Sequence, residues 1–496
     1  MAACSAAPRD PNVLTVLSLA RPEHIDPRHP ADAFGSALSR LVFGALYDSD
    51  PRTFLPRPSL AAPVRWRTPT QAELELRPGV RFHDGRPLRA EDVVATFRSV
   101  LDAGGRSRLR DTYARVIRDV RADGERVVFD LHHPDGSFES LLQLPILRAE
   151  DARARGELVA REGVTLVGTG ALRVRSLREG AWEFERAEPR GDRPARVRVI
   201  PLRDPNALAL RMLHADGDIA ELKPDLLPVF ARSSAFAVRS SPSAGFTYVG
   251  MRGDRGPLAD VRVRRALAYA IDREGLRRAR LGRYAVPATG PIPPTHWAYE
   301  GGVTRYPHDP ARARALLDEA GFRGRPRMTL TLRVSSQRFA MLIGQALVAM
   351  LGEVGVAVEL RPSELGTLLA DLRAGRFDLT LLTMPDLSDP WGVSWLFSSS
   401  ARPTPRDPRA GGNRWRYSNA TLDEALDAGR RALGPEARRP HYARAQRILA
   451  EDLPVIPLWH PNVVFAAGPR VRALQPRGDA QYGFLLDATL RDAPTR

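Results

Sequence analysis

The strongest constraint on the fold of this chain is a regular alternation of helical and extended segments between residues 260 and 383. Apolar residues recur at three- and four-residue spacing in the helical segments and form short runs in the extended ones. Asp260 and Asp309 stand where helix N-caps are expected, and Gly321 stands where the second helix should stop. The expected elements are a helix after Asp260, a helix from Pro310 to Gly321, a strand at Met328 to Val334, a helix to about Gly352, a strand at Val354 to Leu360, a helix at Leu365 to Ala374 and a strand at Phe377 to Thr383.

This order predicts an α/β fold, a twisted and largely parallel sheet with helices on its faces. Because such sheets bind ligands beyond the carboxyl ends of their strands, we expect a binding site in the segment after Thr383. The first part of the chain is richer in strands and loops. Its expected elements are strands at Val13 to Leu19, Glu73 to Leu76 and Arg126 to Leu131, and a short helix at Ala37 to Leu46. At 496 residues, the usual ~150 residues per domain suggests about three domains.

The charge balance is the unusual feature of the composition. The 74 basic and 58 acidic residues give a net charge of +16, which raises nucleic acid or an anionic membrane as a partner. Lys223 is the single lysine, however, and the arginines are scattered with no block of five like charges. A surface adapted to phosphate would be expected to use both residue types. We therefore interpret the charge as arginine usage typical of a GC-rich genome, and expect no nucleic-acid partner.

Little in the sequence suggests catalysis. The chain has one cysteine, Cys4, which excludes an internal disulfide and a cysteine-based metal site. It has no Gly-rich phosphate loop, no H-E-x-x-H and no G-x-S-x-G. His24 with His29, and His132 with His133, lack a third ligand nearby in sequence. We expect no enzyme, no catalytic residue, no bound metal and no cofactor.

The segment Met1-Ala2-Ala3-Cys4-Ser5 lacks the charged and apolar regions of a complete signal peptide. Its Ala-Ala-Cys-Ser end resembles the end of a bacterial lipoprotein signal, in which the cysteine carries the lipid. That resemblance implies that Cys4 is lipidated and that the upstream signal is missing from this sequence. The alternative is a cytosolic chain with an incidental cysteine near its start.

Several segments resemble family 5 of the extracellular solute-binding proteins, the oligopeptide- and dipeptide-binding components of bacterial ABC importers. The first is Arg77 to Val93, which reads RPGVRFHDGRPLRAEDV. The second is Asp260 to Arg273, and the third is Asp309 to Phe322. Weaker matches stand at Ile25-Asp26-Pro27, Val167 to Gly170, Gly217 to Ile219, Gly375 to Asp378 and Leu453 to Leu458. The matches cover nearly the whole chain in the order expected for the family.

The resemblance implies a two-lobed periplasmic-binding-protein-like (type II) α/β fold, with a hinge and an additional inserted domain. In that layout residues 12–49, 162–249 and 470–496 form the N-terminal lobe, residues 50–161 the inserted domain, and residues 250–469 the C-terminal lobe. The implied function is capture of a peptide or similar small solute between the two lobes, by hinge closure, and delivery to the permease subunits of an ABC transporter. We expect a monomer in the periplasm or otherwise outside the cytoplasm, with a lipidated Cys4 as its membrane anchor.

In peptide-binding relatives an aspartate four residues before a proline pairs with the α-ammonium of the ligand. Here Asp386 stands four residues before Pro390, directly after an expected strand. A carboxylate that is buried on closure needs a cation, which an ammonium supplies. The alternative is that Asp386 only begins a turn. The chain also departs from the family here, because Pro385 has no N–H for a peptide backbone and Thr383-Met384 replaces the tryptophan that relatives often carry.

Further ligand residues are expected from the same resemblance and from residue type. Peptide binders pair with the ligand main chain as a strand, and the segment chosen for this is Phe246–Met251, which contains Tyr248, Gly250 and Met251. Arg338 is the expected partner of a ligand carboxylate. The aromatic residues expected to wall the side-chain pockets are Trp391, Trp395, Trp415 and Tyr417.

Two alternatives stay open at this stage. Binders of nickel chelates, haem and oligosaccharides share the fold, so the ligand is not settled by the family. Some regulators carry the same domain behind a DNA-binding module, but only a dozen residues precede the first expected strand.

Overall fold

The computed structural model describes residues 10–21, 24–30, 32–154, 156–158, 166–178, 180–188, 191, 193–324, 326–404, 411–477 and 482–491. The chain divides into two compact units. Unit 1 contains residues 1–51, 56–241 and 463–496, and unit 2 contains residues 52–55 and 242–462. Strand β18 (Val455–Ala467) begins in unit 2 and ends in unit 1.

Unit 1 is built on a mixed sheet in which β1 (Val13–Ser18) is central. It pairs in parallel with β10 (Arg196–Pro201) and with β11 (Ile219–Glu221), and β11 pairs antiparallel with the end of β18. The remaining strands follow in the order β10, β9 (Ala181–Arg186) and β8 (Leu172–Arg178), all antiparallel. The other elements of the unit are β2 (Tyr47–Ser49), β3 (Pro56–Pro58), α3 (Arg110–Val116), α4 (Phe138–Leu141), α5 (Ala149–Arg153), α6 (Pro205–Leu213), α7 (Leu227–Ala231), β12 (Ala237–Pro242, which ends at the first residue of unit 2), β19 (Val471–Ala473), β20 (Thr489–Leu490) and those named below.

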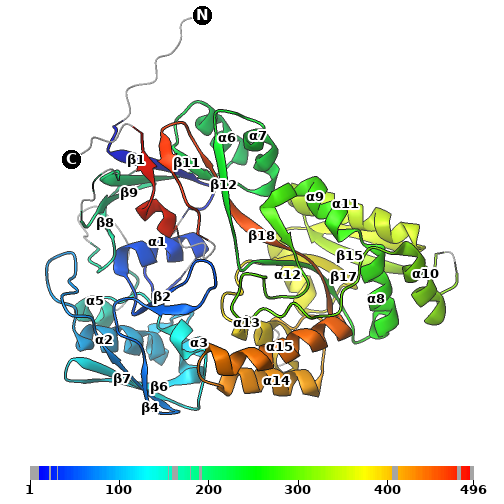
Figure 1. Ribbon diagram of the computed structural model, residues 1–496, viewed down its shortest axis with the longest axis horizontal. Coiled ribbons are helices and arrows are strands. Elements are labelled where there is room, and N and C mark those ends of the chain that lie inside the picture. Colours follow the sequence, from blue (N-terminus) through cyan, green and yellow to red (C-terminus); the bar gives the residue numbers. More distant parts are fainter. Residues whose placement is uncertain are drawn as a thin grey trace, which may run out of the picture. The chain divides into compact units, whose positions relative to one another are not determined.

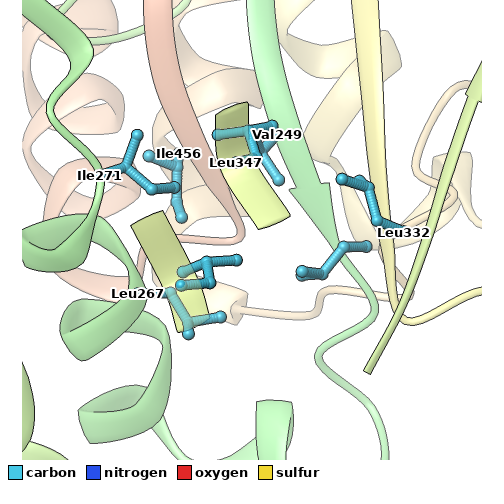
Figure 2. Close-up of a pocket in the computed structure, with 8 residues that line it drawn as sticks. Val249, Leu267, Ile271, Leu332, Leu347 and Ile456 are labelled. Carbon is cyan, nitrogen blue, oxygen red and sulfur yellow. The ribbon is translucent and has the colours of Figure 1, made fainter. Parts of the chain in front are cut away.

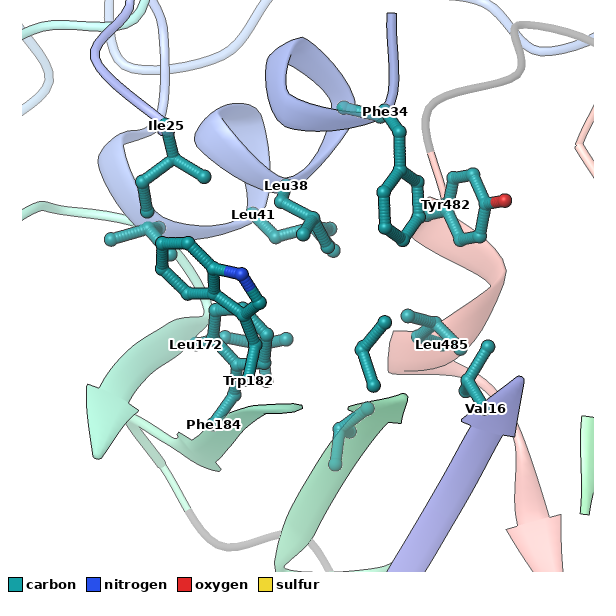
Figure 3. Close-up of a cluster of buried hydrophobic side chains, with 14 of the residues drawn as sticks. Val16, Ile25, Phe34, Leu38, Leu41, Leu172, Trp182, Phe184, Tyr482 and Leu485 are labelled. Carbon is teal, nitrogen blue, oxygen red and sulfur yellow. The ribbon is translucent and has the colours of Figure 1, made fainter. Parts of the chain in front are cut away.

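Helix α1 (Ala33–Phe43) lies against this sheet and closes its main core (Figure 3). Phe34 of the helix meets Tyr482, near the C-terminus, edge to face with ring centroids 4.8 Å apart. Trp182 and Phe184 from β9 are fully buried on the same cluster. The core of unit 1 therefore joins residues from both ends of the chain.

A second hydrophobic cluster of unit 1 lies between a four-stranded antiparallel sheet and helix α2 (Ala90–Leu101). The strand order is β4 (Arg65–Thr68), β5 (Gln71–Glu75), β7 (Arg126–Leu131) and β6 (Ile117–Asp123). The segment from Arg77 to Val93 follows β5 and includes the first turn of α2. In this segment, Nε2 of His83 lies 2.8 Å from the carbonyl oxygen of Gly170, and Nδ1 of the same ring accepts the N–H of Gly168. The histidine thus ties this segment to the chain that leads into β8.

The sheet strands of unit 2 have the order β16-β15-β17-β13-β18. Strand β15 (Met328–Ser335) runs parallel to both β16 (Val356–Ser363) and β17 (Leu379–Met384). Strand β13 (Phe246–Met251) runs antiparallel to β17 and to β18, and the short β14 (Ala285–Pro287) also pairs with β18. The helices are α8 (Val261–Ala270), α9 (Arg273–Arg280), α10 (Pro310–Glu319), α11 (Arg338–Glu353), α12 (Leu365–Arg373), α13 (Trp391–Phe397), α14 (Ala420–Arg431) and α15 (Pro435–Asp452).

Helices cover both faces of this sheet. On one face, apolar residues of α8 and α11 meet those of the sheet, including Leu267, Leu347 and Val249 (Figure 2). On the other face Tyr248, Leu372 and Trp415 belong to a cluster that α12, α13, α14 and α15 complete. Figure 1 shows α14 and α15 side by side at the edge of the unit. The predicted α/β order, with its parallel strands and crossover helices, is confirmed.

The predicted element boundaries hold to within a few residues. The side chain of Asp260 accepts the N–H of Arg262, and that of Asp309 accepts the N–H of Arg312, so both act as the predicted N-caps. Strand β16 begins at Val356 rather than Val354 because Gly355, with φ of +85°, takes the left-handed turn that follows α11. No helix among the described residues is long and apolar enough to cross a membrane.

Unit 2 starts and ends earlier than the lobe 250–469 expected from the family. Its first boundary precedes β13, because both neighbours of that strand belong to the sheet of unit 2. Most of the second cluster of unit 1 comes from residues 50–161, the segment expected to form an inserted domain. The division into three domains stays a prediction.

Candidate functional site

The candidate site lies at one edge of the unit 2 sheet, where the parallel strands β15 and β17 have their carboxyl ends. Strand β15 ends at Ser335 and β17 ends at Met384. The antiparallel neighbour β13 starts at this edge, with Phe246 opposite Met384. The segments that leave the two parallel strands carry Arg338 and Asp386, so the fold brings both predicted residues to the same sheet edge. This is the position that α/β sheets use for ligands.

Asp386 is exposed and begins the loop between β17 and α13. One of its carboxylate oxygens, Oδ1, accepts the N–H of Ser388 at 2.8 Å, an Asx turn. No guanidinium or ammonium group of the described chain forms an ion pair with Asp386. The turn and a binding role are therefore compatible, because one oxygen shapes the loop and the other has no protein partner within the described ranges.

Arg338 is the first residue of α11 and its side chain is exposed. Within the described part of the chain it contacts no carboxylate. Its guanidinium is thus exposed at this sheet edge. A binding role for it remains a prediction.

Trp391 and Trp395 lie on α13, directly after the loop that carries Asp386, and both are partly exposed. The indole of Trp395 stacks under Arg414, whose guanidinium carbon lies 5.9 Å from the ring centroid. Both tryptophans are accessible to a ligand, and their role as pocket walls remains a prediction.

Trp415 cannot wall a pocket because its side chain is fully buried. It packs edge to face against Tyr248, with centroids 5.4 Å apart, and against Phe377. It also fills the space beside Gly250, where a Cβ atom would come within 2.0 Å of the indole ring. The prediction for Trp415 is therefore wrong: this residue is core.

The prediction that Phe246–Met251 pairs with the main chain of a ligand is also wrong. Strand β13 is hydrogen-bonded to β17 on one side and β18 on the other, so it has no free edge for an added strand. Tyr248, Gly250 and Met251 are buried on the faces of the sheet. Burial raises the pKa of the Tyr248 hydroxyl. These three residues build the sheet that carries the site.

Tyr417 is tied into the structure by its hydroxyl group, which donates to Oδ2 of Asp452 at 2.6 Å. Asn419 donates to the same oxygen at 2.8 Å. Burial, followed by the hydrogen bond to this carboxylate, raises the pKa of Tyr417. The hydroxyl is thus committed to the C-terminal end of α15, and only part of the ring is exposed.

The cavity drawn in Figure 2 is not a peptide site. It is lined by Val249, Leu267, Ile271, Leu332, Leu347, Leu351, Leu379 and Ile456, with no polar side chain among them. Peptide ends and amides placed there would lose their hydrogen bonds to water without replacement.

Cys4, the predicted lipid attachment site, lies outside the described residues.

Three residues that the sequence analysis missed hold the Asp386 loop. Arg438 pairs with Asp389, Nη2 to Oδ1 at 3.2 Å, and is almost fully buried. His296 contacts the carbonyl oxygen of Ser388 through Nε2 at 2.9 Å. Asp389 could have been noticed as the second acid of the Asp386-x-x-Asp389-Pro390 segment. Arg438 is one of very many arginines, and nothing in the sequence near His296 points to this loop.

The fold is that of the type II periplasmic-binding class. The ABC transporter substrate-binding protein CtaP of Listeria monocytogenes superposes with a TM-score of 0.83, at 22% identity, over 98% of this chain and all of that chain. A family model described as bacterial extracellular solute-binding proteins, family 5 middle, matches residues 56–404. The chain belongs to this family. The resemblance seen in the sequence is thereby confirmed, together with the substrate-binding role in ABC transport that characterises the family.

Two relatives are similar over most of their length. Di/tripeptide-binding protein 2 of Pseudomonas aeruginosa is 29% identical over 93% of this chain and 92% of its own length. Protein XP55 of Streptomyces lividans is 31% identical over 86% of this chain and 80% of its own.

Proposed function

We propose that this protein binds a short peptide with a free amino terminus at the carboxyl edge of the unit 2 sheet. The observation that carries the proposal is the exposed carboxylate of Asp386, which has no cationic partner among the described residues and stands where parallel sheets hold ligands. An α-ammonium group would complete it with a charge-assisted hydrogen bond. The similarity to a di/tripeptide-binding protein supports a ligand of this class.

Partner and location belong to the same proposal. The protein would act as a monomer outside the cytoplasm and deliver the peptide to the permease subunits of an ABC importer. The family supports both points, since its members are extracellular solute-binding proteins. The Ala2-Ala3-Cys4 pattern supports a lipid anchor at Cys4. In this proposal the protein performs no chemistry on its ligand.

The test compares ligand-induced stabilisation for variants of two exposed aspartates. Asp386→Ala removes the proposed ammonium partner, whereas Asp427→Ala removes an exposed carboxylate of α14 whose ion pairs with arginines are 3.8 and 3.9 Å long. A defined pool of di- and tripeptides is added to each protein, and the same pool with acetylated amino groups serves as the second probe. A ligand at about 100 times its Kd stabilises the folded state by about 2.7 kcal/mol, which a melting curve resolves.

We expect the free peptides to raise the Tm of the wild type and of Asp427→Ala but not that of Asp386→Ala. The acetylated pool should have no effect, because it offers no ammonium. Equal shifts for Asp386→Ala and the wild type would remove Asp386 from the site. A shift with Ni(II)–histidine and none with any peptide would show that the ligand class is wrong.

A further inference from the structure

The loop that carries Asp386 is held by contacts from three separate parts of unit 2. It runs from Asp386 to Pro390, between β17 and α13. The N–H of Leu387 donates to the carbonyl oxygen of Ala244 at 3.0 Å, just before β13. The Leu387 side chain is buried in the aromatic cluster of the unit. The start of the loop is thus fixed to the sheet and to the core, while the Asp386 carboxylate points into solvent.

The far end of the loop is fixed through Asp389. Its Oδ1 accepts the N–H of Trp391 at 2.7 Å, which starts α13, and also accepts from the Arg438 guanidinium. Arg438 lies on α15 and is 3% exposed, with its guanidinium over the ring of Trp297 at 5.2 Å. Burial disfavours the charge, but the Asp389 carboxylate outweighs it and raises the pKa of Arg438. This pair is held in one geometry, because the buried guanidinium of Arg438 would be an uncompensated charge without Asp389.

The middle of the loop is fixed by His296. Its Nδ1 accepts the N–H of Ala298 at 3.0 Å, so the proton of the neutral ring is on Nε2 and is donated to the Ser388 carbonyl oxygen. Burial lowers the pKa of His296 to about 4, which keeps this tautomer at neutral pH. The ring stacks on Phe54 with centroids 5.7 Å apart. Phe54 belongs to the short segment Arg52–Leu55 that groups with unit 2, and it is almost fully buried.

The two acidic residues of the loop therefore differ in their charge pairing. Asp389 is paired with a buried guanidinium, whereas Asp386, three residues earlier, has only the N–H of Ser388 among the described groups. The loop thus presents one charge-unpaired carboxylate at a position defined by its anchors. Preorganisation of this kind improves affinity, because the loop does not lose conformational freedom when the ligand binds.

We propose that Arg438 and His296 are positioning residues of the ligand site. They fix the loop so that Asp386 faces the ammonium group of the ligand, and Arg438 neutralises Asp389 so that it does not compete for that group. This inference rests on the proposed function, since it assigns the ammonium to Asp386.

The test uses Arg438→Met and, as the matched control, Arg28→Met in unit 1. Arg28 is also 3% exposed and forms a buried pair with Asp26, Nη2 to Oδ2 at 2.7 Å. Both variants should lower the Tm, because each leaves a carboxylate without its cation, fully buried in the case of Asp26 and partly buried in the case of Asp389. Peptide affinity is then measured by calorimetry well below both transitions, and hydrogen exchange of residues 384–396 is followed by mass spectrometry in the absence of ligand.

We expect the Kd of Arg438→Met for the stabilising peptides to rise about tenfold or more, equivalent to about 1.4 kcal/mol for each factor of ten. The loop amides should exchange faster in this variant. Arg28→Met should keep wild-type affinity and wild-type loop exchange. Arg438→Lys, which retains the charge, should recover part of the affinity. His296→Gln, whose amide group can still donate to Ser388, should also bind the peptides more tightly than His296→Ala. If Arg438→Met does not fold, the affinities of Arg438→Lys, His296→Gln and His296→Ala test the inference instead.

Two results would overturn the inference. One is wild-type affinity in Arg438→Met despite faster loop exchange, which would make the pair merely structural. The other is unchanged loop exchange in that variant, whether or not any peptide binds. If the wild type binds no peptide, the proposed function fails, while the exchange data still decide whether Arg438 holds the loop.

Discussion

Replacing Gly250 by alanine tests most directly whether β13 is core or ligand surface. A Cβ atom at this position would lie 2.0 Å from Cζ3 of Trp415 and 2.6 Å from two further ring atoms. Carbon atoms prefer separations of about 3.5–4.0 Å, so the ring would have to move by more than about 1 Å. Trp415 has no space for this movement, because it is fully buried against Tyr248 and Phe377. Overpacking a core costs about 1–3 kcal/mol, and an overlap this close should reach the upper end or exceed it.

The assay is thermal unfolding together with peptide affinity for Gly250→Ala and for Gly352→Ala. In domains of about 150–250 residues each kcal/mol shifts the Tm by about 2–4 °C, so Gly250→Ala should lower it by about 6–12 °C. Gly352 lies on the exposed side of α11 with no atom near its Cβ position, so alanine there should stabilise the helix by about 0.5–1 kcal/mol. Both variants should keep wild-type affinity while folded. An unchanged Tm with weakened binding in Gly250→Ala would refute the assignment of Gly250 to the core.

The remaining predictions concern buried polar groups of unit 2. Burial lowers the pKa of His296 and His460 to about 4, against about 6.5 in an unfolded chain, so the unfolded state takes up protons first as the pH falls. The free energy of unfolding should be highest above about pH 6.5 and should fall towards pH 4, with a loss of about 2 kcal/mol per histidine at pH 5. Urea titrations at pH 7 and pH 5 measure this loss. The loss should be smaller in His460→Gln, which has one titrating histidine fewer. Tyr417→Phe removes the hydrogen bond to Asp452 and should cost about 1–3 kcal/mol in the same titration, with unchanged peptide affinity. Weaker binding at wild-type stability would instead place Tyr417 in the ligand site.

The position of Asp386 could be predicted because every step of the argument was local. The hydrophobic pattern located strand β17, the helix–strand order made its neighbour parallel, and the residues after its carboxyl end followed in sequence. The state of that carboxylate was not predictable. Whether the Asp386 carboxylate has a cationic partner depends on which of the chain's many arginines lie near it. The nearby guanidinium of Arg438 pairs with Asp389 and not with Asp386.

The prediction for Trp415 failed for a different reason. A tryptophan in sequence is equally suited to a core and to a pocket wall, because both bury the ring against apolar atoms. Trp395 stays partly exposed on α13, whereas Trp415 packs into the gap left by Gly250 on a strand 165 residues earlier in the numbering. Only the approach of those two segments distinguishes the two residues.

The sequence by itself determined the order of elements in unit 2, the N-caps at Asp260 and Asp309, and the place of Asp386 at the end of a parallel strand. These features depend on periodicity and on neighbours a few residues apart. The tertiary structure decided that β13 lies between β17 and β18, and that His296 and Arg438 hold the Asp386 loop from 92 and 49 residues away. Contacts at such separations are selected by the packing of whole elements, and no local pattern of residues records them.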